Sequence, residues 1–217
     1  MSPVIHCPIT LCPPPPRDQT KLFNYLFTPN HKQEATEKLL QAEEGLRRAI
    51  DFIMLEMLEP GRSEEPFQAE VENLDRIIEE GLEVSKLLQG EQRFIVNRDT
   101  DSDRYYKTFL IFKSQLSRLE EMHNLARRIP VRVPQSAPLV QMFRIVQRMQ
   151  FRALSGKRNH HELVDRLLDK MEDSFSKTEP PQSSQEFISQ ASLFHLFREI
   201  KRYYRRMQEA PAEAVLK

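Results

Sequence analysis

Apolar residues recur every three or four positions along most of this chain, which is the spacing of a helix that buries one face. Such stripes run through about residues 31–58, 66–90, 105–126 and 137–154. The third stretch has the most regular series, at Tyr105, Phe109, Phe112, Leu116, Leu119, Met122 and Ala126. Strand-like alternation of apolar and polar residues is missing, so the pattern predicts amphipathic helices.

Helix-breaking residues separate these stretches. Pro60 and Gly61 end the first predicted helix, and Pro66 opens the second at a first-turn position that proline tolerates. Pro130 and Pro134 end the third. Because the connections are short and helices of about 25 residues are roughly 40 Å long, we expect neighbouring helices to run antiparallel.

Residues 154–204 predict two further helices and the turn between them. Capping boxes open both helices, Asn159 with Glu162 in the first and Ser183 with Glu186 in the second. The apolar stripe of the first helix is Leu163, Leu167, Met171 and Phe175. The apolar face of the second helix is Phe187, Ala191, Phe194, Ile200, Tyr204 and Met207.

The sequence therefore predicts an all-α fold, an elongated up-and-down antiparallel bundle of about five to six helices. We expect this bundle to occupy residues 21–209. Residues 1–20 include four consecutive prolines, which favour an extended polyproline conformation and predict a linker or a disordered tail. Residues 210–217 are expected to form a flexible tail.

Composition narrows the class of function. The chain has 217 residues, a formal net charge of zero and five glycines, which are too few for a Gly-rich phosphate loop. No run of about 18 apolar residues occurs, so we expect no bilayer-spanning helix in this chain. The first residues lack the basic start and apolar core of a signal peptide. The cysteines, Cys7 and Cys12, lie in the proline-rich tail, which fits a reducing compartment and makes a poor metal site.

Candidate catalytic and metal-binding residues have ordinary structural explanations. His160 and His161 are adjacent, so on a helix they point about 100° apart and cannot easily share an ion. His123 and His195 are expected at the edge of the core. A di-iron site in a bundle needs two Glu-x-x-His motifs, and Glu120 with His123 is a single copy. We therefore predict no catalytic residue, no metal ligand, no cofactor and no enzymatic activity.

Charge is unevenly distributed although the net charge is zero. Residues 56–91 hold eleven acidic and three basic residues, whereas residues 127–158 hold eight basic residues and no acidic one. Within the basic segment Arg144, Arg148 and Arg152 recur at spacing four and form one stripe on a helix. The stripe has three interpretations: it faces water or the acidic helix, it faces an anionic membrane surface, or it binds nucleic acid. We expect no nucleic acid, because base-stacking aromatics are missing from the segment.

The C-terminal stretch carries an ordered series of short motifs. In sequence order they are Leu154-Ser155, Asn159, Leu167-Leu168, Met171, Phe175, Pro180-Pro181, Glu186-Phe187, Leu193-Phe194 and Tyr203-Tyr204. Weaker motifs upstream are Leu26-Phe27 with Pro29-Asn30, and Tyr105-Tyr106 with Phe109, Gln115-Leu116 and Met122. Over about residues 22–207 the chain resembles the C-terminal cytoplasmic domain of the putative aromatic acid exporter family, which are fusaric-acid-resistance-like membrane transporters. Gly156 and Lys157 depart locally from the family's pattern.

The resemblance implies a helical domain with a regulatory or assembly role beside a transmembrane part, which we expect to be absent from this chain. It implies the cytoplasmic face of the cell membrane as the location. The implied partners are the transmembrane part of the exporter, an anionic membrane surface and a second copy of the domain. The apolar residues 22–27 would then lie next to the membrane, although they can equally pack on the bundle. The alternative function is a free-standing helical module that binds protein or nucleic acid.

The position of the two cysteines generates a prediction about stability. Replacing both Cys7 and Cys12 by serine is expected to leave the free energy of unfolding unchanged within about 0.5 kcal/mol, because neither residue belongs to a helical stripe. Thermal denaturation followed by circular dichroism measures the change. A markedly lower melting temperature would mean that the tail is part of the folded domain.

Overall fold

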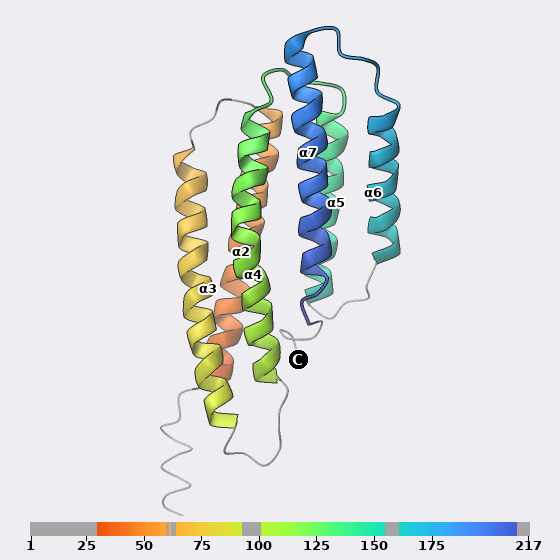
Figure 1. Ribbon diagram of the computed structural model, residues 1–217. Coiled ribbons are helices and arrows are strands. Elements are labelled where there is room, and N and C mark those ends of the chain that lie inside the picture. The colour runs from red at the N-terminus through yellow and green to blue at the C-terminus, as the bar shows by residue number, and fades with distance from the viewer. Residues whose placement is uncertain (1–29, 60, 62–63, 93–100, 155–160, 212–217) are drawn as a thin grey trace, which may run out of the picture. The chain divides into compact units, whose positions relative to one another are not determined.

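The computed structural model describes residues 30–59, 61, 64–92, 101–154 and 161–211. These residues form six helices: α2 (His31–Leu58), α3 (Glu65–Gln92), α4 (Asp101–Arg127), α5 (Ser136–Leu154), α6 (His161–Ser176) and α7 (Ser184–Met207). Figure 1 shows successive helices running in alternate directions. The predicted all-α, up-and-down bundle is confirmed, and no residue in the described ranges is in a strand.

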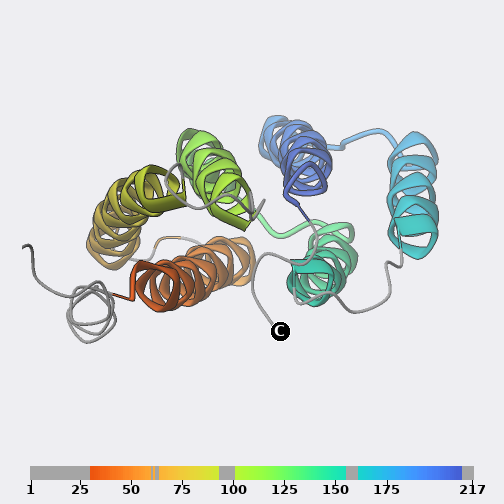
Figure 2. The same ribbon diagram turned by 90° about the horizontal axis from the view of Figure 1, so that it is seen from below.

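Two groups of helices share one core. Helices α2, α3 and α4 each pack against the other two. Helix α5 packs against α2, and α7 packs against α4 and α5, so the second group joins the first along two seams. Helix α6 packs on α5, on the side away from the first group, as the end-on view in Figure 2 shows.

The stripes that predict the first three helices also form their buried faces. In α2 the buried stripe is Ala35, Leu39, Ala42, Leu46, Ala49, Ile53 and Met57. In α3 it includes Phe67, Val71, Leu74, Ile78, Leu82 and Leu88. In α4 all seven positions of the regular series are buried. Each large apolar side chain that leaves water contributes about 1.5–3 kcal/mol, so these faces are the main source of stability.

The buried face of α6 differs from the predicted stripe. Val164, Leu168 and Met171 are buried, whereas Leu163 is 42% exposed and Leu167 is half-buried. The prediction treated every fourth apolar residue as core. Helix α6 makes its main helix contact with α5, so it buries a narrow face and leaves the flanking apolar residues outside.

The predicted face of α7 is correct in its C-terminal half and wrong at its start. Phe187 is 62% exposed, and Ala191 and Phe194 are half-buried. The inward positions at this end are instead Ser189, Ser192, Leu193, Leu196 and Phe197. Two serines thus occupy buried positions at this end, whereas Phe194 contacts the Phe175 ring of α6 with 5.5 Å between centroids.

Local hydrogen bonds fix where α7 begins. The Ser183 hydroxyl accepts a hydrogen bond from the backbone N–H of Glu186 at 3.1 Å, and the Glu186 carboxylate accepts one from the N–H of Gln182 at 2.9 Å. The predicted capping at this end is therefore confirmed. One turn later, the Ser189 hydroxyl donates to the carbonyl of Val131 at 2.8 Å and accepts from its N–H at 3.2 Å. These bonds tie α7 to the connection between α4 and α5.

Helices α3 and α4 come unusually close at one point. The backbone of Gly81 lies against the buried ring of Phe109, and a Cβ atom added to Gly81 would be 2.3 Å from that ring. Gly90, in the last turns of the same helix, has nothing within 4 Å of such an added atom. The first glycine is thus required by packing, and the second is not.

Several predicted features fall outside the described residues. They are the proline-rich residues 1–20 with both cysteines, the apolar residues 22–27, the cap Asn159 and residues 212–217. The predictions made for these segments remain predictions.

The contrast between the two glycines of α3 is directly testable. Gly81→Ala is expected to lower the free energy of unfolding by about 1–3 kcal/mol, because the added methyl group overpacks the Phe109 ring. Urea denaturation of the full chain measures the loss.

Gly90→Ala is the matched control within the same helix. It is expected to be neutral or to raise stability by up to about 1 kcal/mol, since alanine is the better helix former. Equal effects of the two substitutions would contradict the close contact between Gly81 and Phe109.

Candidate functional site

The arginine stripe lies on the outer face of α5. Arg144 and Arg148 are exposed, and their positions are opposite the buried residues Leu139 and Val146 on the helix. No ion-pair partner for Arg144 or Arg148 is found among the residues that the structure describes. Arg152 belongs to α5, but its side chain lies outside the described part of the chain. The two described arginines therefore present unneutralised charge to the surroundings.

The acidic helix α3 is paired with α2 and α4. Lys38 and Arg48 of α2 bind Glu80 at 2.5 Å and Glu70 at 2.9 Å. The hydrogen bond from Lys38 holds the pKa of Glu80 below its ordinary value. Helix α5, by contrast, packs against α2, α6 and α7.

Helix α4 supplies the remaining partners of this acidic face. Lys113 pairs with Glu79 at 2.7 Å and also with Asp75, and Arg127 pairs with Glu64. The hydrogen bond that Lys113 donates to Asp75, followed by the one that it donates to Glu79, raises the pKa of Lys113. Pairing of the arginine stripe with the acidic helix is thus not what the described contacts show.

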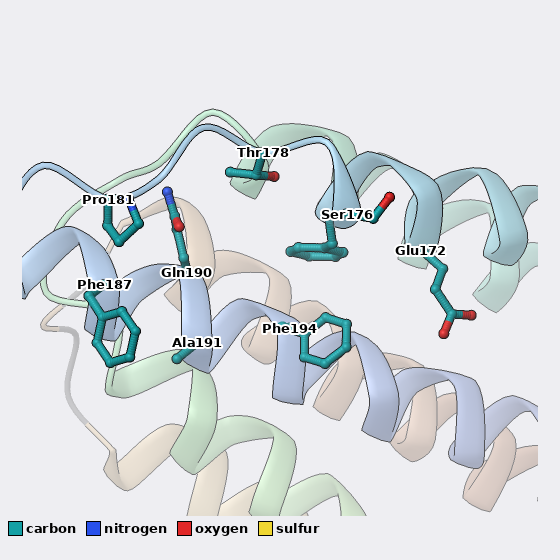
Figure 3. Close-up of a pocket in the computed structure, with 9 residues that line it drawn as sticks. Glu172, Ser176, Thr178, Pro181, Phe187, Gln190, Ala191 and Phe194 are labelled. Carbon is teal, nitrogen blue, oxygen red and sulfur yellow. The ribbon is translucent and has the colours of Figure 1, made fainter.

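A pocket of about 470 Å³ lies between the end of α6 and the start of α7, closed at one end by the turn that joins them. Figure 3 shows Phe187, Ala191 and Phe194 along one wall, with Pro181 and Thr178 near the turn. Phe175 of α6 also lines the pocket, and its ring contacts that of Phe194 edge-on at 5.5 Å between centroids. The wall is therefore mostly apolar, and three of its side chains are phenylalanine rings.

The polar residues of this pocket are bonded within the chain. The carboxylate of Glu172 pairs with Lys201 at 2.6 Å, which lowers the pKa of Glu172. The Thr178 hydroxyl donates to the carbonyl of Ser174 at 3.0 Å and accepts from Gln135 at 2.9 Å. The Ser176 hydroxyl donates to the carbonyl of Asp173 at 2.8 Å. The described lining thus offers no unpaired charge to a ligand.

Sequence reasoning missed this pocket because it assigned Phe187 and Phe194 to the core. A signal was present in the sequence. Phe187 and Ile188 are adjacent, so on a helix their side chains point about 100° apart. A single buried face cannot contain both of them and also Leu193 and Phe194. Excess apolar residues on a helix that is not buried all round indicate an exposed apolar surface.

The histidines fit structural roles. His123 is 3% exposed, and its ring stacks on Phe67 with 3.8 Å between the ring centroids. Burial lowers the pKa of His123, so the ring is neutral at pH 7. His195 is exposed beside Phe194, and His160 lies outside the described residues.

Metal-binding clusters are likewise missing from the part of the chain that the structure describes. There, no group of three or more His, Cys, Asp or Glu side chains could hold an ion, and this includes the surroundings of Glu120 and His123.

The carboxyl of Glu43 on α2 is an unusually weak acid. Burial raises the pKa of its carboxyl to about 7, opposed by the charge of Arg47 and reinforced by Glu44. The side chain is half-buried on a helix that packs against three neighbours. Because Glu43 does not line the pocket, we assign this effect to stability rather than to chemistry.

None of the described helices is long and apolar enough to cross a bilayer.

Comparison with known proteins gives one family and one fold relative. The family described as "Putative aromatic acid exporter C-terminal domain" matches residues 24–206. The crystal structure of a putative membrane protein from Clostridium difficile 630 is similar, with a TM-score of 0.64 and 18% sequence identity. The similarity covers 82% of this chain and 97% of that chain, and at this identity it shows the fold alone. No curated protein matches the chain.

The raised pKa of Glu43 predicts a pH-dependent stability. In the unfolded chain this carboxyl has its ordinary pKa, near 4.5. The folded state therefore holds the proton more tightly. The stabilising contribution is complete below about pH 4.5 and is lost as the pH rises through about 7.

Glu43→Gln is accordingly expected to stabilise the protein at pH 8 by about 1–2 kcal/mol, after allowance for partial exposure, and to stabilise it less at pH 5. Urea denaturation at both pH values measures the difference. Glu83→Gln, which changes an exposed side chain on α3, is the control and is expected to have little effect at either pH. A stabilisation by Glu43→Gln that is the same at pH 5 and pH 8 would contradict the assignment.

Proposed function

Because the chain belongs to the family of putative aromatic acid exporter C-terminal domains, we propose that it is the helical domain that assembles with, or regulates, the transmembrane part of such an exporter. The observation that carries this proposal is the family match, which extends through all six described helices. The fold relative from Clostridium difficile 630 is itself described as a putative membrane protein, which supports a place beside a membrane. The proposed role is in transport and not in catalysis.

We further propose that the domain lies at the cytoplasmic face and that the arginine stripe on α5 faces the anionic leaflet. The support is electrostatic. Arg144 and Arg148 are exposed and have no ion-pair partner in the described residues, whereas four acids of α3 are paired with cations of α2 and α4. Uncompensated arginines on one helix face are suited to a surface that carries negative charge.

The stripe would orient the domain and would not anchor it. Each basic residue near an anionic surface contributes about 1 kcal/mol, and at about 0.1 M salt the attraction is screened over about 10 Å. Three arginines therefore give weak, reversible binding. Firm attachment would come from the transmembrane part of the exporter.

Binding to vesicles tests the orientation. The full chain is expected to cosediment with phosphatidylserine-containing vesicles at low salt and to be released as salt is added. The triple variant Arg144→Gln, Arg148→Gln, Arg152→Gln is expected to bind several-fold less.

The matched control removes the same charge elsewhere, with Lys86→Gln, Lys107→Gln and Lys170→Gln on α3, α4 and α6, where all three side chains are exposed. It is expected to bind like the unaltered chain. Equal loss in both triple variants, or no binding of the unaltered chain, would overturn the orienting role. Assembly with the transmembrane part is tested separately, by co-purification of the two from detergent-solubilised membranes.

A further inference from the structure

The pocket between α6 and α7 exposes more aromatic surface than the packing of the domain requires. Phe187 is 62% exposed and the adjacent Ile188 is 48% exposed, although both lie on a helix with an otherwise well-buried face. Leaving a phenyl ring in water forgoes a large burial energy, and a concave apolar patch on a folded domain marks a binding surface.

The hollow has a structural cause. Val164, Leu168 and Met171 direct the buried face of α6 toward α5, and the main contacts of α7 are with α4 and α5. The two helices approach each other through the rings of Phe175 and Phe194, whose centroids are 5.5 Å apart. Between these rings and the turn a space of about 470 Å³ stays unfilled, which is within the range of small-molecule sites.

The chemistry of the wall selects the charge of the occupant. Glu172 is neutralised by Lys201 at 2.6 Å, and the hydroxyls of Ser176 and Thr178 donate to backbone carbonyls of the same chain. No cationic side chain lines the pocket, so an anion entering it would lose its water without gaining a partner. An uncharged molecule is weakly hydrated by comparison, so its entry into the pocket does not carry this desolvation cost.

The shape of the wall selects a flat ring. Phe175, Phe187 and Phe194 line the space, and the small side chain of Ala191 lies between Phe187 and Phe194 along the wall (Figure 3). Aromatic rings gain from edge-to-face and offset-stacked contacts with such side chains, beyond the area that they bury. We propose that this pocket binds a small, uncharged aromatic molecule as an effector of the domain. Binding there does not depend on contact with a membrane.

Indole is a suitable probe, and benzamide with benzoate forms a matched pair that differs in charge. In saturation-transfer NMR on the full chain, indole and benzamide are expected to bind saturably, with a dissociation constant on the order of 1 mM or lower. Benzoate is expected to bind more weakly than benzamide. Absence of saturable indole binding, or benzoate binding as tightly as benzamide, would overturn the proposal.

Two variants locate the binding. Ala191→Phe places a ring in the pocket and is expected to weaken indole binding about tenfold or more, the effect of losing one or more ring contacts. Phe187→Ser removes an exposed ring, is tolerated by the fold because that ring is outside the core, and is expected to weaken binding similarly. Ala69→Phe adds the same ring at an exposed position of α3 and is the control.

The variants also distinguish a ligand from a second copy of the chain. If indole binds Ala191→Phe and Phe187→Ser as tightly as it binds the unaltered chain, the site lies elsewhere and the proposal is wrong. If sedimentation velocity shows a dimer that Phe187→Ser converts to a monomer, a second copy of the chain covers this wall. That result would also contradict the proposal. A monomer that binds indole through residues 187 and 191 supports it.

Discussion

The contact between the bare backbone of Gly81 and the ring of Phe109 sets the distance between α3 and α4. At that distance the charged edges of both helices come within reach of each other, so Lys113 can pair with Glu79 and Asp75 across the seam. A larger residue at position 81 would push the helices apart and lengthen every pair along that edge. The close packing of α3 on α4 and the ion pairs between these two helices thus occur along the same seam.

That neutralisation explains where the free charge of the domain lies. Four acids of α3 are paired with cations of its two packing partners, and α5 packs against α2, α6 and α7. Arg144 and Arg148 are left facing outward on a chain whose net charge is zero. A net charge of zero is therefore compatible with a basic helix face, and the average charge says little about what that face meets.

The sequence predicted the helices of the first group well, because the apolar positions of their stripes, such as the series from Tyr105 to Ala126, are the ones that the neighbouring helices bury. The prediction was wrong at the start of α7, which has more apolar residues than one helix face can bury. The position of α6 determines which of them are buried, and the sequence does not show that position. Gly81 and Gly90 look alike in the sequence, both inside a helical pattern, and only the neighbouring ring distinguishes them. The sequence shows that the arginines of the stripe share one helix face. Whether Arg144 and Arg148 have ion-pair partners depends on which helices lie beside α5, and the sequence does not show this.

The position of α6 has a consequence for how the domain opens. This helix is held mainly by α5 and by side-chain contacts with α7 such as the pair between Glu172 and Lys201, whereas α4 is enclosed by three other helices. Segments with few neighbours open at a lower free energy than the whole domain unfolds. Amide hydrogens of α6 are therefore expected to exchange with solvent before those of α2, α3 and α4. A helix of this kind can respond to a bound molecule while the rest of the fold keeps its structure.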